Sequence, residues 1–227
     1  MALHMQRAFD RLKRKVLSLS ALVEESLQKS VKALEERDGA LARRIIDADV
    51  ETDQKEVEVE EECLKILALH QPVAIDLRFI IAAIKINNDL ERIGDLAVNI
   101  AERAEYLATQ KRPDEPFDFA AMADRARSML RRALDALVNM DACLAREVCA
   151  DDDEVDAMNR QMYDQVKDAI HRRPEKVDAL IHILSASRHL ERVADHATNI
   201  AEDVIYMIEG EIVRHRSEDY INRRATR

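Results

Sequence analysis

The chain has 227 residues, of which 35% are charged and 47% hydrophobic, with three glycines, four prolines and no tryptophan. So few glycines and prolines leave little material for tight turns, and aromatic residues make up only 4%, so the composition favours long helices over sheets. The formal net charge of −10 argues against a nucleic-acid-binding protein, which needs a concentrated basic face.

The cysteines and the hydrophobic runs indicate the compartment. Cys63, Cys143 and Cys149 are an odd number with no CxxC pair, which suits a reducing environment. No apolar segment of the signal-peptide type follows the basic residues near the N-terminus. Charge-free stretches such as residues 79–84 are too short to span a bilayer. We therefore expect a cytoplasmic protein without membrane insertion.

Basic residues gather near both ends of this acidic chain. The first group is Arg7, Arg11, Lys13, Arg14 and Lys15, and the second is Arg214, Arg216, Arg223, Arg224 and Arg227. Such clusters are usually solvated helix ends, and contact with an acidic partner is the alternative.

Three amphipathic helices are predicted in the first half. The first has apolar residues spaced by three and four, which is the period of one helix face: Phe9, Leu12, Val16, Leu19, Val23, Leu27, Val31 and Leu34. Asp38 and Gly39 end it. A second helix is expected over residues 40–69 and ends before Pro72, because proline disfavours a helical predecessor. The third covers residues 74–108.

The second half repeats this pattern after a linker at residues 111–116, which contains two prolines. Helices are expected over residues 117–139 and 143–171, followed by a break at Pro174 and a last helix to about residue 215. The sequence thus predicts an all-α protein without strands. Its two domains, residues 5–110 and 117–216, would be tandem antiparallel three-helix bundles.

The halves are also related residue by residue. Residues 90–102 (LERIGDLAVNIAE) and 190–202 (LERVADHATNIAE) are identical at nine of thirteen positions. Shared helical composition does not produce so many identities, so one supersecondary unit has been duplicated.

The repeated segment carries acids four residues apart, Glu91 with Asp95 and Glu191 with Asp195. Residues at this spacing share one helix face. Further polar residues extend the two faces: Asn99, Glu102, Asn199 and Glu202. The helical period places this row roughly opposite the apolar stripe, so we expect it to face outward.

The preceding helix of each half also carries an acid pair: Asp49 and Asp53, and then Asp152 and Asp156. In an antiparallel hairpin centred on Pro72, residues whose numbers average 72 lie level. Asp53 is then level with Glu91, and Asp49 with Asp95. In the second half, the residue numbers of Asp156 and Glu191 average 173.5, beside Pro174, and so do those of Asp152 and Asp195. These pairs should therefore also lie level in an antiparallel hairpin. Each hairpin would gather four carboxylates.

Four neighbouring carboxylates repel one another unless cations neutralise them. Oxygen-only ligand sets suit hard cations, so the sequence predicts divalent or trivalent metal ions of open identity: Mg, Ca, Mn or Fe. A solvated acidic face without metal is the alternative.

Other chemical signatures are weak or missing. His182, His189 and His196 recur every seven residues, which suits a proton-sensitive row or, more commonly, a partly exposed helix flank. The sequence contains no glycine-rich phosphate loop and no Glu-x-x-His motif of the di-iron type. No recognisable nucleophile motif surrounds a Ser or Cys. We therefore expect no enzymatic activity.

The doubled LER-x-x-D-x-x-x-N-I-A-E run and the paired acids of the preceding helix resemble the PhoU family. Residues 72–78 (PVAIDLR) are similar to the proline–alanine–aspartate–leucine–arginine signature of that family. Two departures lie in the second half, where Ala194 stands at the position of Gly94 and Pro174 is not followed by the full signature.

The resemblance implies a cytoplasmic accessory protein of the phosphate ABC importer that represses the phosphate starvation response. It would link the importer's ATPase to a phosphate-sensing histidine kinase, and the family is often dimeric, which implies a homodimer. Some members bind multinuclear metal clusters through Glu/Asp-x-x-x-Asp motifs, which correspond here to the eight acids above. The alternatives are a metal-carboxylate enzyme or iron-handling helical protein, and a plain helical scaffold.

Overall fold

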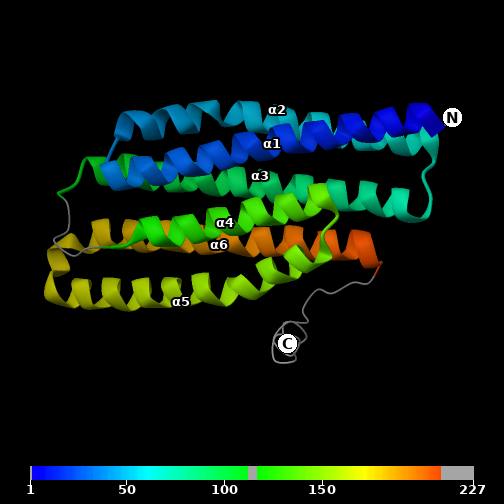
Figure 1. Ribbon diagram of the computed structural model, residues 1–227. Coiled ribbons are helices and arrows are strands. Elements are labelled where there is room, and N and C mark those ends of the chain that lie inside the picture. Colours follow the sequence, from blue (N-terminus) through cyan, green and yellow to red (C-terminus); the bar gives the residue numbers. More distant parts are fainter. Residues whose placement is uncertain (1, 112–116, 211–227) are drawn as a thin grey trace, which may run out of the picture.

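The computed structural model describes residues 2–111 and 117–210 (Figure 1), and within these ranges it contains no β-strand. Six long α-helices account for most of them: α1 (Ala2–Glu36), α2 (Gly39–His70), α3 (Ala74–Ala108), α4 (Phe119–Asn139), α5 (Ala142–Arg172) and α6 (Val177–Glu209). A short 3₁₀ turn, η1 (Pro174–Lys176), joins α5 to α6. The all-α prediction is confirmed, and all helices but the last end within a few residues of the expected places.

Aspartates begin three of the helices. The carboxylate of Asp38 accepts a hydrogen bond from the backbone N–H of Leu41 at 2.9 Å, and Asp118 and Asp141 accept equivalent bonds at the starts of α4 and α5. These bonds satisfy N–H groups that have no partner inside the helix, which fixes where each helix begins.

The last helix is shorter than expected. The structure ends α6 at Glu209, because Gly210 adopts a left-handed conformation with φ of 77°. Glycine takes this conformation without steric cost and commonly stops a helix. The rest of the expected helix, residues 211–215, lies outside the described residues, as do the 216 boundary of the second domain and most of the linker.

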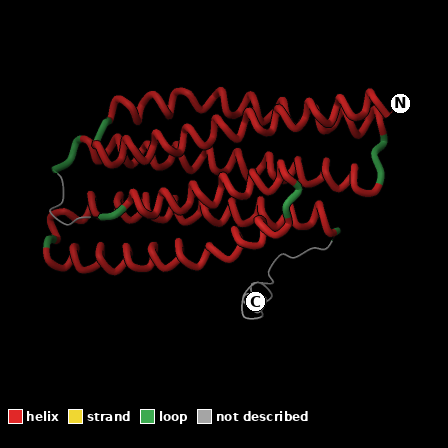
Figure 2. Tube along the Cα trace, viewed as in Figure 1, coloured by secondary structure: helices red, strands yellow, loops and turns green. Residues whose placement is uncertain are grey.

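The two three-helix units lie side by side with α3 and α6 next to each other (Figures 1 and 2). Helix α3 contacts α1 and α2 of its own unit, and α6 contacts α4 and α5. Helix α1 also contacts α4. The sequence predicted each bundle of three but did not show that the two units pack against one another along their third helices.

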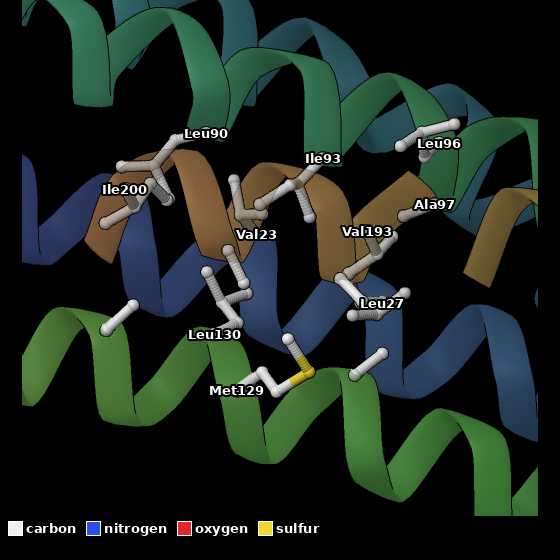
Figure 3. Packing of buried hydrophobic residues seen from close by; sticks show 14 of the residues in the cluster. Val23, Leu27, Leu90, Ile93, Leu96, Ala97, Met129, Leu130, Val193 and Ile200 are labelled. Carbon is white, nitrogen blue, oxygen red and sulfur yellow. The ribbon is translucent and has the colours of Figure 1, made fainter. Parts of the chain in front are cut away.

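One hydrophobic core therefore runs through both halves. Figure 3 shows Leu90 and Ile93 of α3, Val193 and Ile200 of α6, and side chains from α1 and α4 around them. Leu90, Ile93, Val193 and Ile200 are fully buried. Burial of a large aliphatic side chain contributes about 1.5–3 kcal/mol, so this shared layer stabilises the association of the units as well as each unit.

Polar contacts cross the same junction. Lys85 Nζ lies 2.9 Å from Oδ1 of the buried Asp203. Nδ1 of His196 lies 2.8 Å from Oδ1 of Asp89, which is itself buried. A buried carboxylate is costly unless it is paired, so these contacts favour one register of α3 against α6.

Leu90→Ala tests the shared core. We expect it to lower the free energy of unfolding by about 2–5 kcal/mol through lost burial and a cavity, measured by urea unfolding followed by circular dichroism. Leu69→Ala is the control, because Leu69 is 76% exposed and should change stability by less than about 0.5 kcal/mol. Equal effects of the two substitutions would contradict the described core.

Candidate functional site

Contacts between neighbouring helices test the predicted hairpin register. Asn87 Nδ2 of α3 donates hydrogen bonds to the backbone oxygen of Glu56 in α2 at 3.1 Å and to its Oε1 at 2.8 Å. In the second half, Ser187 Oγ donates to Asn159 Oδ1 at 2.8 Å. The residue numbers of these pairs average 71.5 and 173. The register predicted around Pro72 and Pro174 is therefore confirmed.

Gly94 lets α2 approach α3 beside the first acidic group. A β-carbon added to Gly94 would lie 3.1 Å from Thr52 Cγ2 and 3.9 Å from Asp49 Oδ1. The Thr52 distance is shorter than an ordinary van der Waals contact, so the missing side chain is what permits this spacing. Asp49 is held against α3 as a result.

The first acidic face consists of Asp49 and Asp53 of α2 with Glu91 and Asp95 of α3. Burial, followed by the charges of Asp53, Asp95 and Glu91, raises the pKa of Asp49 to about 6. The pKa of Glu91 is also raised, first by burial and then by Asp95. The four carboxylates are therefore within electrostatic reach of one another.

The second acidic face consists of Asp152 and Asp156 of α5 with Glu191 and Asp195 of α6. Burial, followed by Asp195 and Asp156, raises the pKa of Asp152 to about 6, against a hydrogen bond with Thr198 that lowers it. Burial and neighbouring acids also raise the pKa values of Glu191 and Asp195. The two faces thus share the same electrostatic character.

Arginines offset part of this repulsion. Arg92 lies 3.4 Å from Glu91 Oε2 and 3.7 Å from Asp95 Oδ2, and Arg160 lies 3.4 Å from Asp156 Oδ2. Both arginines are more than half exposed, and exposed ion pairs contribute little. Oε2 of Glu91, the atom nearest Arg92, is buried and accepts no hydrogen bond from the described residues, so no hydrogen bond reinforces this ion pair. Ion pairing therefore leaves the first face incompletely neutralised.

As the side chains stand, no group of three or more His, Cys, Asp or Glu residues in the described ranges could hold a metal ion. The acids are brought level by the backbone, but their carboxylates do not converge on one point. Because each face is half-buried to exposed, side-chain rotation at the surface decides whether a ligand set can form. The metal-ligand assignment of the eight acids stays a prediction.

The four residues expected to extend the faces have different surroundings. Asn99 is half-buried, Glu102 is exposed and accepts a bond from Arg103 at 2.9 Å, and Glu202 is half-buried. Asn199 donates to Asp89 Oδ1 across the junction at 3.4 Å. The Asn199 amide is therefore directed to the other half of the molecule.

A cleft of about 350 Å³ opens between α1 and α2 and reaches the first acidic face. It is lined by Asp49 and Thr52 and by side chains of both charges from the two helices, including Glu25, Lys29 and Arg44. The sequence pattern did not predict this cleft, because it depends on how α1 lies against α2.

The histidine row faces α3. His182 stacks on Tyr106 with ring centroids 3.8 Å apart, and His196 contacts Asp89. His189 Nε2 lies 3.2 Å from Ser185 Oγ on the same helix. Burial and the charge of Arg103 lower the pKa values of His182 and His189. These side chains belong to the junction between the halves, and Asp89 and Asp203 are the acids there that sequence patterns missed.

Comparisons with known proteins agree with this duplicated architecture. A family model described as the PhoU domain matches residues 16–104 and 119–204. The phosphate-specific transport system accessory protein PhoU homolog of Pseudomonas putida is 38% identical over 201 residues, covering 88% of this chain and 78% of its own. The homolog from Aquifex aeolicus is 36% identical over 211 residues, covering 92% and 95%.

Solved structures match as well. The crystal structure of PhoU from Pseudomonas aeruginosa superposes with a TM-score of 0.88 at 34% identity, covering 91% of this chain and 99% of that one. The phosphate transport system regulatory protein PhoU from Streptococcus pneumoniae has a TM-score of 0.83 at 29% identity, covering 92% and 99%. Fold and site define a duplicated helical-bundle protein with one acidic face in each repeat. The chain belongs to the PhoU family.

The acidic faces should make stability depend on pH in metal-free protein. Because the pKa values of Asp49 and Asp152 rise from 3.8 to about 6 on folding, the folded state holds more protons than the unfolded state between about pH 4 and 6. Stability should therefore fall as pH rises through this window. Asp49→Asn with Asp152→Asn should flatten this fall and raise the melting temperature at pH 7.

Thermal melts across pH 4–8 with a chelator present measure this effect. Glu36→Gln is the control, because Glu36 is exposed and lies outside both acidic faces. Superimposable pH profiles for the wild type and the double variant would show that the acids do not strain the fold.

Proposed function

We propose that this protein is an accessory and regulatory protein of the phosphate-specific transport system. Similarity over nearly the whole chain to proteins that bear this name carries the proposal. The duplicated acid motif supports it, since it occupies equivalent places on α3 and α6 and lies within the matched ranges of both repeats.

The proposed role is negative regulation of the phosphate starvation response. The protein would act in the cytoplasm, as a homodimer, by linking the importer's ATPase to a phosphate-sensing histidine kinase. No described helix is long and apolar enough to cross a membrane. We propose a binding role without catalytic turnover, because the similar proteins are named as accessory and regulatory proteins.

Deleting the gene should derepress phosphate-starvation promoters in phosphate-rich medium, because the kinase would lose its repressive input. A reporter fused to such a promoter measures this, and a plasmid copy of the wild-type gene should restore repression. Full repression in the deletion strain, with no second homologue encoded, would overturn the proposed function.

We also propose that the acidic faces bind divalent or trivalent metal ions. The donor set is all oxygen and its charges repel one another, which suits a hard cation once the exposed side chains rotate toward one ion. The ligands would be Asp49, Asp53, Glu91 and Asp95, with the corresponding four acids of the second half. A bound cation would favour the ionised carboxylates and connect α2 to α3 and α5 to α6.

Added metal should raise the melting temperature, by roughly 5–10 °C at a concentration about a hundredfold above Kd. Asp95→Asn with Asp195→Asn should abolish this gain, because one acid of each face is lost. Scanning calorimetry with Mg, Ca, Mn and Fe measures it, together with elemental analysis of the purified protein.

Glu36→Gln is the matched control and should retain the full response to metal. If no metal shifts the melting curve and none copurifies, the acidic faces are solvated surfaces. They would then serve better as a docking surface for a basic partner.

A further inference from the structure

An apolar groove lies where α1, α3 and the end of α4 meet. Phe79 and Ala83 of α3 form one side, Leu17 of α1 another, and Leu137 and Val138 of α4 the third. Leu17 is 40% exposed and Val138 48%. None of the lining residues belongs to an acidic face, so the two proposals above do not account for this surface.

The edge of the groove is basic. Lys13 lines it, with Nζ 5.4 Å from the centroid of the Phe79 ring. Within the described ranges, neither Lys13 nor the exposed Arg14 forms an ion pair with a carboxylate. Their neighbours do, since Arg11 pairs with Glu62 and Lys15 with Glu58. The basic stretch of α1 is thus paired with carboxylates toward α2, whereas Lys13, which lines the groove, and its neighbour Arg14 have no such partner in the described ranges.

One acid lies near this edge. Asp10 precedes Lys13 by one helical turn, and its Oδ1 accepts a hydrogen bond from the neutral amide of Gln6 at 3.2 Å, so its charge offsets part of the basic edge. The groove thus places exposed aliphatic side chains beside a lysine that has no carboxylate partner in the described ranges. Exposed apolar surface with a polar rim marks interaction sites.

We propose that this groove binds an amphipathic helix with acidic residues from a partner protein. The apolar side chains of the helix would cover Leu17 and Val138, and its carboxylates would face Lys13 and Arg14. Helices commonly dock in apolar grooves in this way, and complementary charges select the partner and its orientation. The inference rests on the proposed function, because that function requires a partner protein.

Charge argues against two other occupants. An anionic lipid surface attracts polybasic segments, but the net charge of −10 opposes approach of the whole protein. In a twofold dimer through this groove, identical patches would meet. Lys13 and Arg14 of the two copies would then be brought together without a neutralising acid.

Photocrosslinking and peptide binding test the proposal on the full chain. Benzoylphenylalanine at position 138 should crosslink, in cells, to a helical segment of another protein that carries both acids and apolar residues. The same probe at position 181 is the control, because Ile181 is 53% exposed on α6, which contributes no residue to the groove. Mass spectrometry identifies the crosslinked segment.

A synthetic peptide with the sequence of that segment should bind the purified protein. Lys13→Glu and Val138→Asp should each weaken binding at least tenfold, whereas the controls Lys167→Glu and Ile181→Asp should leave it unchanged. Replacing the facing acid of the peptide with lysine should restore binding to Lys13→Glu. Circular dichroism of the variants checks that they are folded.

Other results would overturn the inference. In the crosslinking experiment, these are crosslinks only to a second copy of this chain, or crosslinking at position 138 that is no stronger than at position 181. Crosslinks only to phospholipid, together with flotation of the protein on phosphatidylglycerol vesicles, would also overturn it. In the binding experiment, the contrary result is a peptide whose binding Lys13→Glu does not weaken. Derepression in the deletion strain combined with any of these results would refute the groove alone. Absent derepression would refute the proposed function whatever the groove binds.

Discussion

The contact between α3 and α6 is the constraint on which the rest of the structure depends. Each helix is in contact with two helices of its own unit and with the other, so each is buried on most of its circumference. Leu90 and Ile93 meet Val193 and Ile200 there without exposure to solvent. Because interiors are close-packed, this layer fixes the relative position of the two bundles, and α1, α2, α4 and α5 are arranged around it.

The acidic faces follow from that arrangement. Helices α2 and α5 lie at the outside and cover only one side of α3 and α6, so the acids at these seams are half-buried to exposed. Partial burial raises the pKa values of Asp49 and Asp152, and mutual repulsion adds to the effect. Binding of a cation or a basic partner would relieve this repulsion in both repeats and so stabilise the fold.

Duplication did not leave the junction symmetric. The position of Asp89 is held by His189 in the second repeat, and the position of His196 by Leu96 in the first. The contact between a carboxylate and an imidazole therefore forms between Asp89 and His196. The equivalent pair, His189 and Leu96, has no carboxylate and cannot form it. This asymmetry gives the halves different polar surroundings although their backbones are alike.

The sequence by itself determined the helices, the duplication and the hairpin register, because apolar spacing, prolines and capping aspartates act within a few residues of each other. The sequence also identified the acids of both acidic faces, since the turns at Pro72 and Pro174 determine which residues of the paired helices lie opposite each other. Only the tertiary structure decided which helix each apolar stripe meets. Hydrophobic burial is non-directional, so a stripe shows that a face is buried without naming what covers it. For the same reason, the contact of Asn199 with Asp89 and the groove at Val138 were not predictable from sequence patterns.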